Sequence, residues 1–167
     1  NGDGTFTFVS TGMEHLNRSA AAWGDYNQDG FLDLLISGTT EPAGTRTTLI
    51  YRNNGDGTFS DIKAALPGLQ YASLAWGDYD RDGRLDILLA GADDANIYVA
   101  RIYRNNGDGT FTDMQAGLPG LQLAAVAWGD FDNDGYLDLV LSGAGVPNPS
   151  TGETIARSRP VSALKRL

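Results

Sequence analysis

The chain contains no cysteine and only one histidine, His15, in 167 residues. Without cysteine it has no disulfide, no thiolate zinc site and no cysteine nucleophile. A single histidine also excludes a metal centre built from several imidazoles of one chain. Any metal chemistry of this chain must therefore rest on oxygen ligands.

Basic residues are scarce relative to acidic ones: 12 Lys and Arg stand against 21 Asp and Glu, for a net charge of −9. Nucleic-acid binding requires clustered Lys and Arg against the phosphates, so we expect no nucleic-acid partner. No apolar run approaches the roughly 20 residues of a transmembrane helix, and we expect no membrane insertion.

What the chain does have is internal repetition. Asn-Gly-Asp-Gly-Thr-Phe occurs at 1–6, 54–59 and 106–111. Ala-Trp-Gly-Asp occurs at 22–25, 75–78 and 127–130. Both strings recur at offsets of 53 and 52 residues, so two independent markers stay in register across three units.

Each unit is predicted to contain four short strands. The first is rich in Ala and ends in Trp, and its small side chains suit an inner strand where sheets converge: 18–23, 71–76 and 123–128. The second is apolar on both faces, as in a strand buried between two sheets: 32–37, 85–90 and 137–142. The third covers 47–52, 98–104 and 153–157. The Asn-Gly-Asp-Gly turn then leads into the outer, fourth strand.

Four antiparallel strands in a unit of roughly 40–50 residues are typical of a β-propeller blade. We therefore predict an all-β chain whose residues 1–157 form three blades. Segment 5–11 would supply the outer strand of the third blade, as a split (velcro-type) blade. Residues 158–167 leave the repeat pattern and are predicted to be a tail without a binding role.

An acidic loop follows each Trp-Gly, with oxygen-bearing side chains at loop positions 1, 3, 5 and 9. The Gly at position 6 permits a sharp turn, and position 7 can offer its backbone carbonyl. Hard oxygen ligands in this number suit Ca²⁺. The predicted metal ligands are Asp25, Asn27, Asp29, Phe31 and Asp33 in the first loop, Asp78, Asp80, Asp82, Arg84 and Asp86 in the second, and Asp130, Asp132, Asp134, Tyr136 and Asp138 in the third.

The alternative is that these Asp and Gly residues only form turns. Four carboxylates within nine residues, as in the second and third loops, repel one another strongly unless a cation lies among them. We predict one Ca²⁺ per blade and three per chain, with the first loop less acidic because of Asn27. An EF-hand would need a Glu at position 12 and flanking helices, but Ile36, Leu89 and Leu141 occupy that position in apolar strands.

The unit Ala-Trp-Gly-Asp-Tyr-(Asp/Asn)-x-Asp-Gly-x-Leu-Asp, followed by Tyr-Arg-Asn-Asn-Gly-Asp-Gly-Thr-Phe, resembles the bacterial FG-GAP/VCBS-type repeat. Integrin α-subunit propeller blades are similar. The resemblance covers residues 1–157 and implies a propeller with one Ca²⁺ between the first two strands of each blade. It also implies an extracellular or cell-surface setting, in a secreted and bacterial protein. The departures from the family are the short count of three blades and the aberrant tail.

The repeated aromatic residues are expected to pack between strands and blades. For the tryptophans the alternative is a platform that stacks on sugars. The residues concerned are Trp23, Trp76, Trp128, Phe6, Phe59 and Phe111.

The segments that join the second and third strands differ between units: 39–45, 92–96 and 144–151. Strand alternation places them on the face opposite the acidic loops, and loops on a rigid scaffold often carry specificity. We expect a recognition or adhesion module that binds protein or glycan there, as a lectin would. The alternative is a purely structural calcium-stabilised unit. An enzyme is disfavoured because the acidic residues are assigned to calcium and no catalytic constellation stands out.

Three blades fall short of the four to eight that usually close a propeller. They would leave two apolar sheet faces exposed. We therefore expect a homo-oligomer in which two or three chains close a ring, or a chain that is part of a longer propeller. Segment 5–11 of one chain would complete the third blade of the next.

Overall fold

The computed structural model describes residues 2, 4–7, 11–144 and 153–156. These residues form strands and no helix, so no helix among them could span a membrane. The strands are β1 (Leu16–Gly24), β2 (Asp33–Thr40), β3 (Arg46–Asn53), β4 (Phe59–Asp61), β5 (Gln70–Gly77), β6 (Asp86–Ala92), β7 (Tyr98–Asn105), β8 (Phe111–Asp113), β9 (Gln122–Gly129), β10 (Asp138–Ala144) and β11 (Glu153–Ala156).

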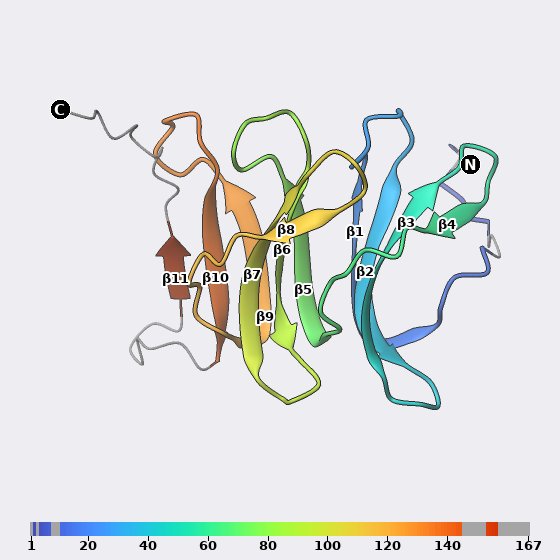
Figure 1. Ribbon diagram of the computed structural model, residues 1–167, viewed down its shortest axis with the longest axis horizontal. Helices are drawn as coiled ribbons and strands as arrows, with labels where there is room; N and C mark the ends of the chain where they lie inside the picture. The colour runs from blue at the N-terminus through green and yellow to red at the C-terminus, as the bar shows by residue number, and fades with distance from the viewer. Residues whose placement is uncertain (1, 3, 8–10, 145–152, 157–167) are drawn as a thin grey trace.

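The strands build three antiparallel sheets that stand side by side (Figure 1). The first two have four strands each, in the orders β1-β2-β3-β4 and β5-β6-β7-β8. The third has the order β11-β10-β9 among the described residues. The predicted all-β class is confirmed, and the sheets are consistent with propeller-like blades.

The count of three blades and the split-blade closure remain predictions. No sheet of the described residues is closed, and Thr5, Thr7 and Thr11 lie outside strands. Residues 8–10, in the middle of the predicted outer strand, are outside the described part. The segment before β1 passes β3, where the Glu14 amide donates to the Tyr51 hydroxyl at 3.1 Å.

In each unit the first and second strands pair in the same register at the end where the acidic loop connects them. Gly24 pairs with Asp33, and the next sheet pairs Gly77 with Asp86 in the same way. Strands therefore extend one residue beyond the predicted Trp and begin at the last Asp of the loop. This Asp is the first residue of the second strand, because its backbone pairs with the Gly that ends the first strand.

The Ala-rich strands are the inner ones, as predicted: β5 lies between β1 and β9 and contacts both (Figure 1). Each has one residue with a left-handed backbone, Arg18 (φ 50°), Tyr71 (φ 51°) or Leu123 (φ 52°). The ladder shifts register beside each of them, which is the mark of a β-bulge and increases the local twist.

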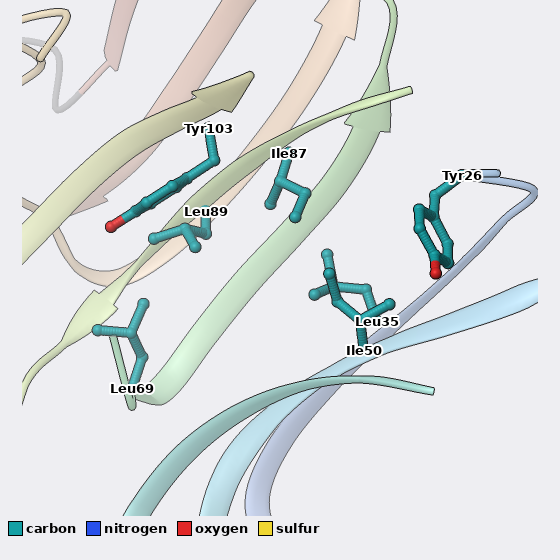
Figure 2. Packing of buried hydrophobic residues seen from close by; sticks show 7 residues of the cluster. All are labelled: Tyr26, Leu35, Ile50, Leu69, Ile87, Leu89 and Tyr103. Atoms are coloured by element: carbon teal, nitrogen blue, oxygen red, sulfur yellow. The ribbon is translucent and has the colours of Figure 1, made fainter. Parts of the chain in front are cut away.

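Strand β6 is buried on both faces, as predicted for the second strands. Its Ile87 and Leu89 pack toward the first sheet, in the cluster shown in Figure 2 with Tyr26, Leu35, Ile50, Leu69 and Tyr103. Its Leu88 and Ala90 pack toward the third sheet, in a second cluster with Ala100, Ile102, Leu121, Leu139 and Leu141. Alternation along β6 thus places one cluster between the first and second sheets and the other between the second and third.

The β1–β2 and β5–β6 loops lie at one end of the sheets, and the β2–β3 and β6–β7 hairpins lie at the other (Figure 1). The predicted placement of segments 39–45 and 92–96 opposite the acidic loops is confirmed. Segment 144–151 is outside the described residues apart from Ala144, which ends β10. The tail at 158–167 is also outside, so the division at residue 157 stays a prediction.

Candidate metal centres and the opposite loop face

Each acidic loop is wrapped around the aspartate that opens it. In the first loop, Asp25 Oδ1 accepts the Asp29 amide at 3.1 Å and Oδ2 accepts the Gly30 amide at 2.9 Å. Gly30 has φ +87°, a conformation that L side chains rarely adopt. The same bonds recur around Asp78 and Asp130. The predicted turn at position 6 is therefore present in all three loops.

The last aspartate of each loop is buried at the start of the second strand: Asp33, Asp86 and Asp138 are 0%, 0% and 4% exposed. Asp86 accepts the Tyr79 amide at 3.1 Å and the Asn105 amide at 2.8 Å. Asp33 and Asp138 accept amides from their own loops in the same way. These bonds fix a carboxylate at the floor of each loop.

Burial raises the pKa of Asp86 to about 6, against an ordinary value of 3.8. The amides of Asn105 and Tyr79 act in the opposite direction, and the nearby charges of Asp80 and Asp82 raise the pKa further. Burial raises the pKa of Asp33 as well. Ionising a buried carboxylate beside other carboxylates costs free energy, and a bound cation would lower this cost.

Two of the loops bring three carboxylates to one point. The groups are Asp78, Asp80 and Asp86 in the second loop and Asp130, Asp132 and Asp138 in the third. Within each group one oxygen of every residue lies within 4.8 Å of the others. Carboxylate oxygens at this spacing fit a hard divalent cation such as Ca²⁺.

The first loop forms no such three-carboxylate group among the described residues. Asn27 stands at position 3, where the other loops have Asp80 and Asp132. Its Nδ2 donates to Asp29 Oδ2 at 2.9 Å. An amide oxygen can still bind Ca²⁺, but the loop has one charge fewer.

The aspartates at position 5 lie outside the two groups and contact arginines or the backbone. Asp82 pairs with Arg84 and, at 3.1 Å, with Arg104. Asp29 pairs with Arg52 at 3.4 Å. Asp134 accepts the Tyr136 amide at 2.8 Å. Their role as metal ligands therefore stays a prediction.

The residues at position 7 were predicted to act through their carbonyls, which no contact here tests. Their side chains point to neighbouring elements. The ring of Phe31 lies against Gly55 of the β3–β4 turn. Arg84 donates to the Asn105 carbonyl at 3.2 Å. Tyr136 lies beneath the Arg81 guanidinium, 5.0 Å from its ring centroid.

Sequence reasoning overlooked the arginines of β3 and β7. Arg104 Nε lies 2.7 Å from Oδ2 of Asp80, which belongs to the three-carboxylate group of the second loop. The sequence did indicate a role for these arginines, because Arg52 and Arg104 hold the same position in the repeated Tyr-Arg-Asn-Asn string. A guanidinium at Asp80 competes with a metal for this carboxylate.

The aromatic packing matches the prediction between sheets but not at the first sheet's outer side. Trp76 stacks on Tyr26 and Trp128 on Tyr79, each with centroids 6.3 Å apart. Phe59 and Phe111 pack against Trp23 and Trp76. Trp23 and Phe6, however, are 58% and 99% exposed. Within the part of the chain that the structure describes, β1 is the first strand, and no earlier sheet there covers Trp23.

At the opposite end of the first two sheets lies a polar hollow of about 640 Å³. Its charged and amide-bearing lining comprises Asn17, Arg18, Glu41, Arg46 and Gln70. Arg46 donates to Asn96 Oδ1 at 2.6 Å, which links the two variable hairpins. This surface offers donors and acceptors from segments that differ between repeats.

The comparisons with known proteins agree with the repeat pattern. The family model for the FG-GAP-like repeat matches residues 42–89 and 78–141. Human Cartilage acidic protein 1 is 30% identical over 158 residues, covering 84% of this chain and 23% of the relative. The mouse protein is 30% identical, and the Xenopus tropicalis protein is 29% identical over 155 residues, each with 84% and 24% covered.

The chain thus spans about a quarter of the length of these curated relatives. They are vertebrate proteins and give no support to the expected bacterial origin. No solved structure matches the chain significantly. The family model alone covers more than half of the chain, and the chain therefore belongs to the FG-GAP-like repeat family.

Proposed function

We propose that this chain is a calcium-binding β-propeller module that serves extracellular recognition or adhesion. The observation that carries the proposal is the meeting of three aspartates in each of the second and third loops. The acidic loops recur with the family's own repeat, and FG-GAP repeats and a relative named for cartilage point to an extracellular protein. Free calcium is available in that setting.

The proposal assigns one Ca²⁺ to each of the three loops. Asp80 and Asp132 lie at matching positions in the two three-carboxylate groups, each beside a buried Asp at the start of the second strand. The first site is the weakest, because Asn27 supplies an uncharged oxygen. The position-5 aspartates and the position-7 carbonyls bring each site to five ligand residues, and a bidentate carboxylate or water supplies the rest of the six to eight oxygens that Ca²⁺ takes.

Isothermal titration of the calcium-free chain tests this assignment. Three ions per chain are expected, and Asp80→Ala and Asp132→Ala, which remove the side-chain oxygens altogether, should each remove or greatly weaken one of them. Asp94→Ala, at an exposed hairpin position, is the control and should change nothing. A chain that takes up no calcium, or variants that keep all three ions, would contradict the proposal.

Recognition is assigned to the variable hairpins and to the polar hollow beside the first of them, the β2–β3 hairpin. Arg18 and Arg46 supply fixed donors, and Glu41 supplies an acceptor, in a surface that suits a polar protein or glycan ligand. The acidic residues serve calcium rather than hydrolysis, so the proposal includes no enzymatic activity. The second candidate is a structural unit that binds no further ligand.

A glycan array combined with a panel of matrix proteins separates these two functions. Binding that is lost when segments 39–45 and 92–96 are replaced by Gly-Ser loops of equal length favours recognition. The same chains must keep their calcium stoichiometry, which shows that the exchange left the fold intact. Absence of binding across both panels favours the structural unit.

A further inference from the structure

Neighbouring sheets meet through one contact that occurs twice in the chain. Trp76 covers Gly24 and stacks on Tyr26, with the rings 11° from parallel. A Cβ added at Gly24 would lie 2.6 Å from the Trp76 ring, so the indole occupies the space of a side chain. One repeat later the contact recurs, with a ring angle of 10° and a Cβ distance of 2.5 Å, between Trp128, Gly77 and Tyr79.

The two halves of this contact are exposed at opposite ends of the row of sheets. Trp23, on β1, is 58% exposed, and Phe59 covers it from within its own sheet. Gly129, on β9, has no heavy atom within 4 Å of an added Cβ. Beside Gly129 lies an apolar hollow of about 210 Å³, lined chiefly by Trp128, Phe131, Leu139 and Val140. β1 and β9 flank β5 on either side (Figure 1).

We propose that Trp23 of one copy of this chain docks on Gly129 of a second copy, as Trp76 docks on Gly24 within the chain. The tryptophan and its glycine seat lie on one molecule, so the chain carries both halves of its own interface. Because the halves differ, the contact is head-to-tail, and such contacts form rings when the rotation closes. Two or three copies then close a ring.

Phe6 gives independent support for a second copy. Phe59 and Phe111 stand at the same repeat position and pack on Trp23 and Trp76 within their sheets, with centroids 6.3 Å apart. Phe6 is 99% exposed in its own chain. Trp128 is the equivalent tryptophan of the third sheet, so the corresponding place for a phenylalanine lies against the Trp128 ring. The first segment of the docked copy brings its Phe6 to that place.

The acidic-loop end of the sheets has a matching polar contact. Gln28 donates to the Gly83 carbonyl of the next loop, and Arg81 lies over Tyr136 of the loop after that. Asn133 holds the same loop position as Gln28 and Arg81, with φ 57° against 60° and 62°. It is exposed at the end of the row. Docking places Asn133 beside the Gly30 turn of the second copy and continues the series.

Sedimentation velocity on the full chain in calcium tests this interface. The wild-type chain should sediment at two or three times 17.8 kDa. Trp23→Ala removes the tryptophan and Gly129→Leu fills its seat, so each variant should sediment as a monomer. Ile97→Ala removes an exposed apolar side chain of the β6–β7 hairpin, where 59% of Ile97 is exposed, and should leave the assembly intact.

Mixing the two monomeric variants is the decisive step, because each retains the half that the other lacks. A complex with one copy of each, absent from either variant alone, supports the proposal and shows that both variants are folded. A wild-type chain that stays at 17.8 kDa overturns it, and the occupant of Gly129 is then a further repeat of a longer protein. An oligomer that both variants leave unchanged, or a mixture that stays monomeric, also overturns it.

Discussion

The Trp76 indole lies directly over the α-carbon of Gly24 and donates to the Ala22 carbonyl at 3.2 Å. One glycine of the Ala-Trp-Gly-Asp string thus receives the tryptophan of the next string. The motif recurs because it provides both sides of the contact between sheets, the ring and the space for it. The Trp and Gly of the string therefore recur at a fixed spacing because they pack against each other between neighbouring sheets.

Replacing the covered glycines by alanine should destabilise the fold. We expect Gly24→Ala and Gly77→Ala to lower the free energy of unfolding by about 1–3 kcal/mol, because the new methyl group would meet an indole ring. Gly129→Ala is the matched control. It should be neutral or stabilising by up to about 1 kcal/mol, since alanine loses less backbone entropy in a strand.

Urea unfolding measures these differences. The three substitutions are best made in the Trp23→Ala background, so that assembly adds nothing to the comparison. Equal effects at Gly24 and Gly129 would show that the indole contact does not determine the cost.

Asn105 should matter more than its repeat equivalent Asn53. Asn105 is 1% exposed, and its Nδ2 donates to the Leu85 carbonyl at 3.1 Å and to the Tyr26 carbonyl of the first sheet at 2.9 Å. Asn53 is partly exposed, and among the described residues its Nδ2 donates to one carbonyl, that of Leu32, at 3.1 Å. We expect Asn105→Ala to cost about 1–3 kcal/mol and Asn53→Ala less than about 1 kcal/mol. Chemical unfolding of the pair checks the order, and a larger loss for Asn53→Ala would refute it.

The sequence predicted the strands well because their patterns are local. Small residues before Trp, apolar runs and Asn-Gly-Asp-Gly turns each determine a segment without reference to distant parts of the chain. The acidic loops could be located for the same reason. Their spacing directly determines which backbone amides Asp25 and its equivalents accept.

Contacts between repeats were harder to predict, because they depend on how sheets are placed. Nothing local shows that Arg104 reaches Asp80 across the sheet, or that Leu69 closes the core between two sheets. The repeated Leu-Pro-Gly-Leu strings at 66–69 and 118–121 are the part of the sequence that indicates such contacts. Gly120 passes so close to the Tyr98 carbonyl that an added Cβ would lie 1.8 Å from its oxygen.

Acidification should affect the calcium-free chain through Asp86. Its pKa of about 6 in the fold exceeds the ordinary 3.8, so the folded chain binds more protons between these values than the unfolded chain. The stabilisation is fully present below about pH 4 and is lost as the pH rises through about 6, by at most about 3 kcal/mol. Asp33 contributes in the same direction.

The measurement is the free energy of unfolding at about pH 4.5 and about pH 7 in calcium-free buffer, for the wild type and for Asp86→Asn. The variant cannot titrate at this position, so its decline over the interval should be smaller than that of the wild type. Calcium should reverse the wild-type trend, because it binds the ionised carboxylate. Identical pH dependence in the two chains would show that Asp86 ionises normally.

Arg104 should weaken calcium binding at the second loop. Its guanidinium contacts Asp80 at 2.7 Å and Asp82 at 3.1 Å, so the metal must displace a cation that already pairs with these carboxylates. We expect Arg104→Gln to tighten the second site severalfold and leave the third unchanged. Arg101→Gln is the control. Arg101 lies on β7, as Arg104 does, but it pairs with Asp113 at 2.8 Å, away from the loop. Titration calorimetry measures the calcium affinity of the second site against that of the third. Weaker binding in Arg104→Gln would mean instead that the arginine holds Asp80 in position for the metal.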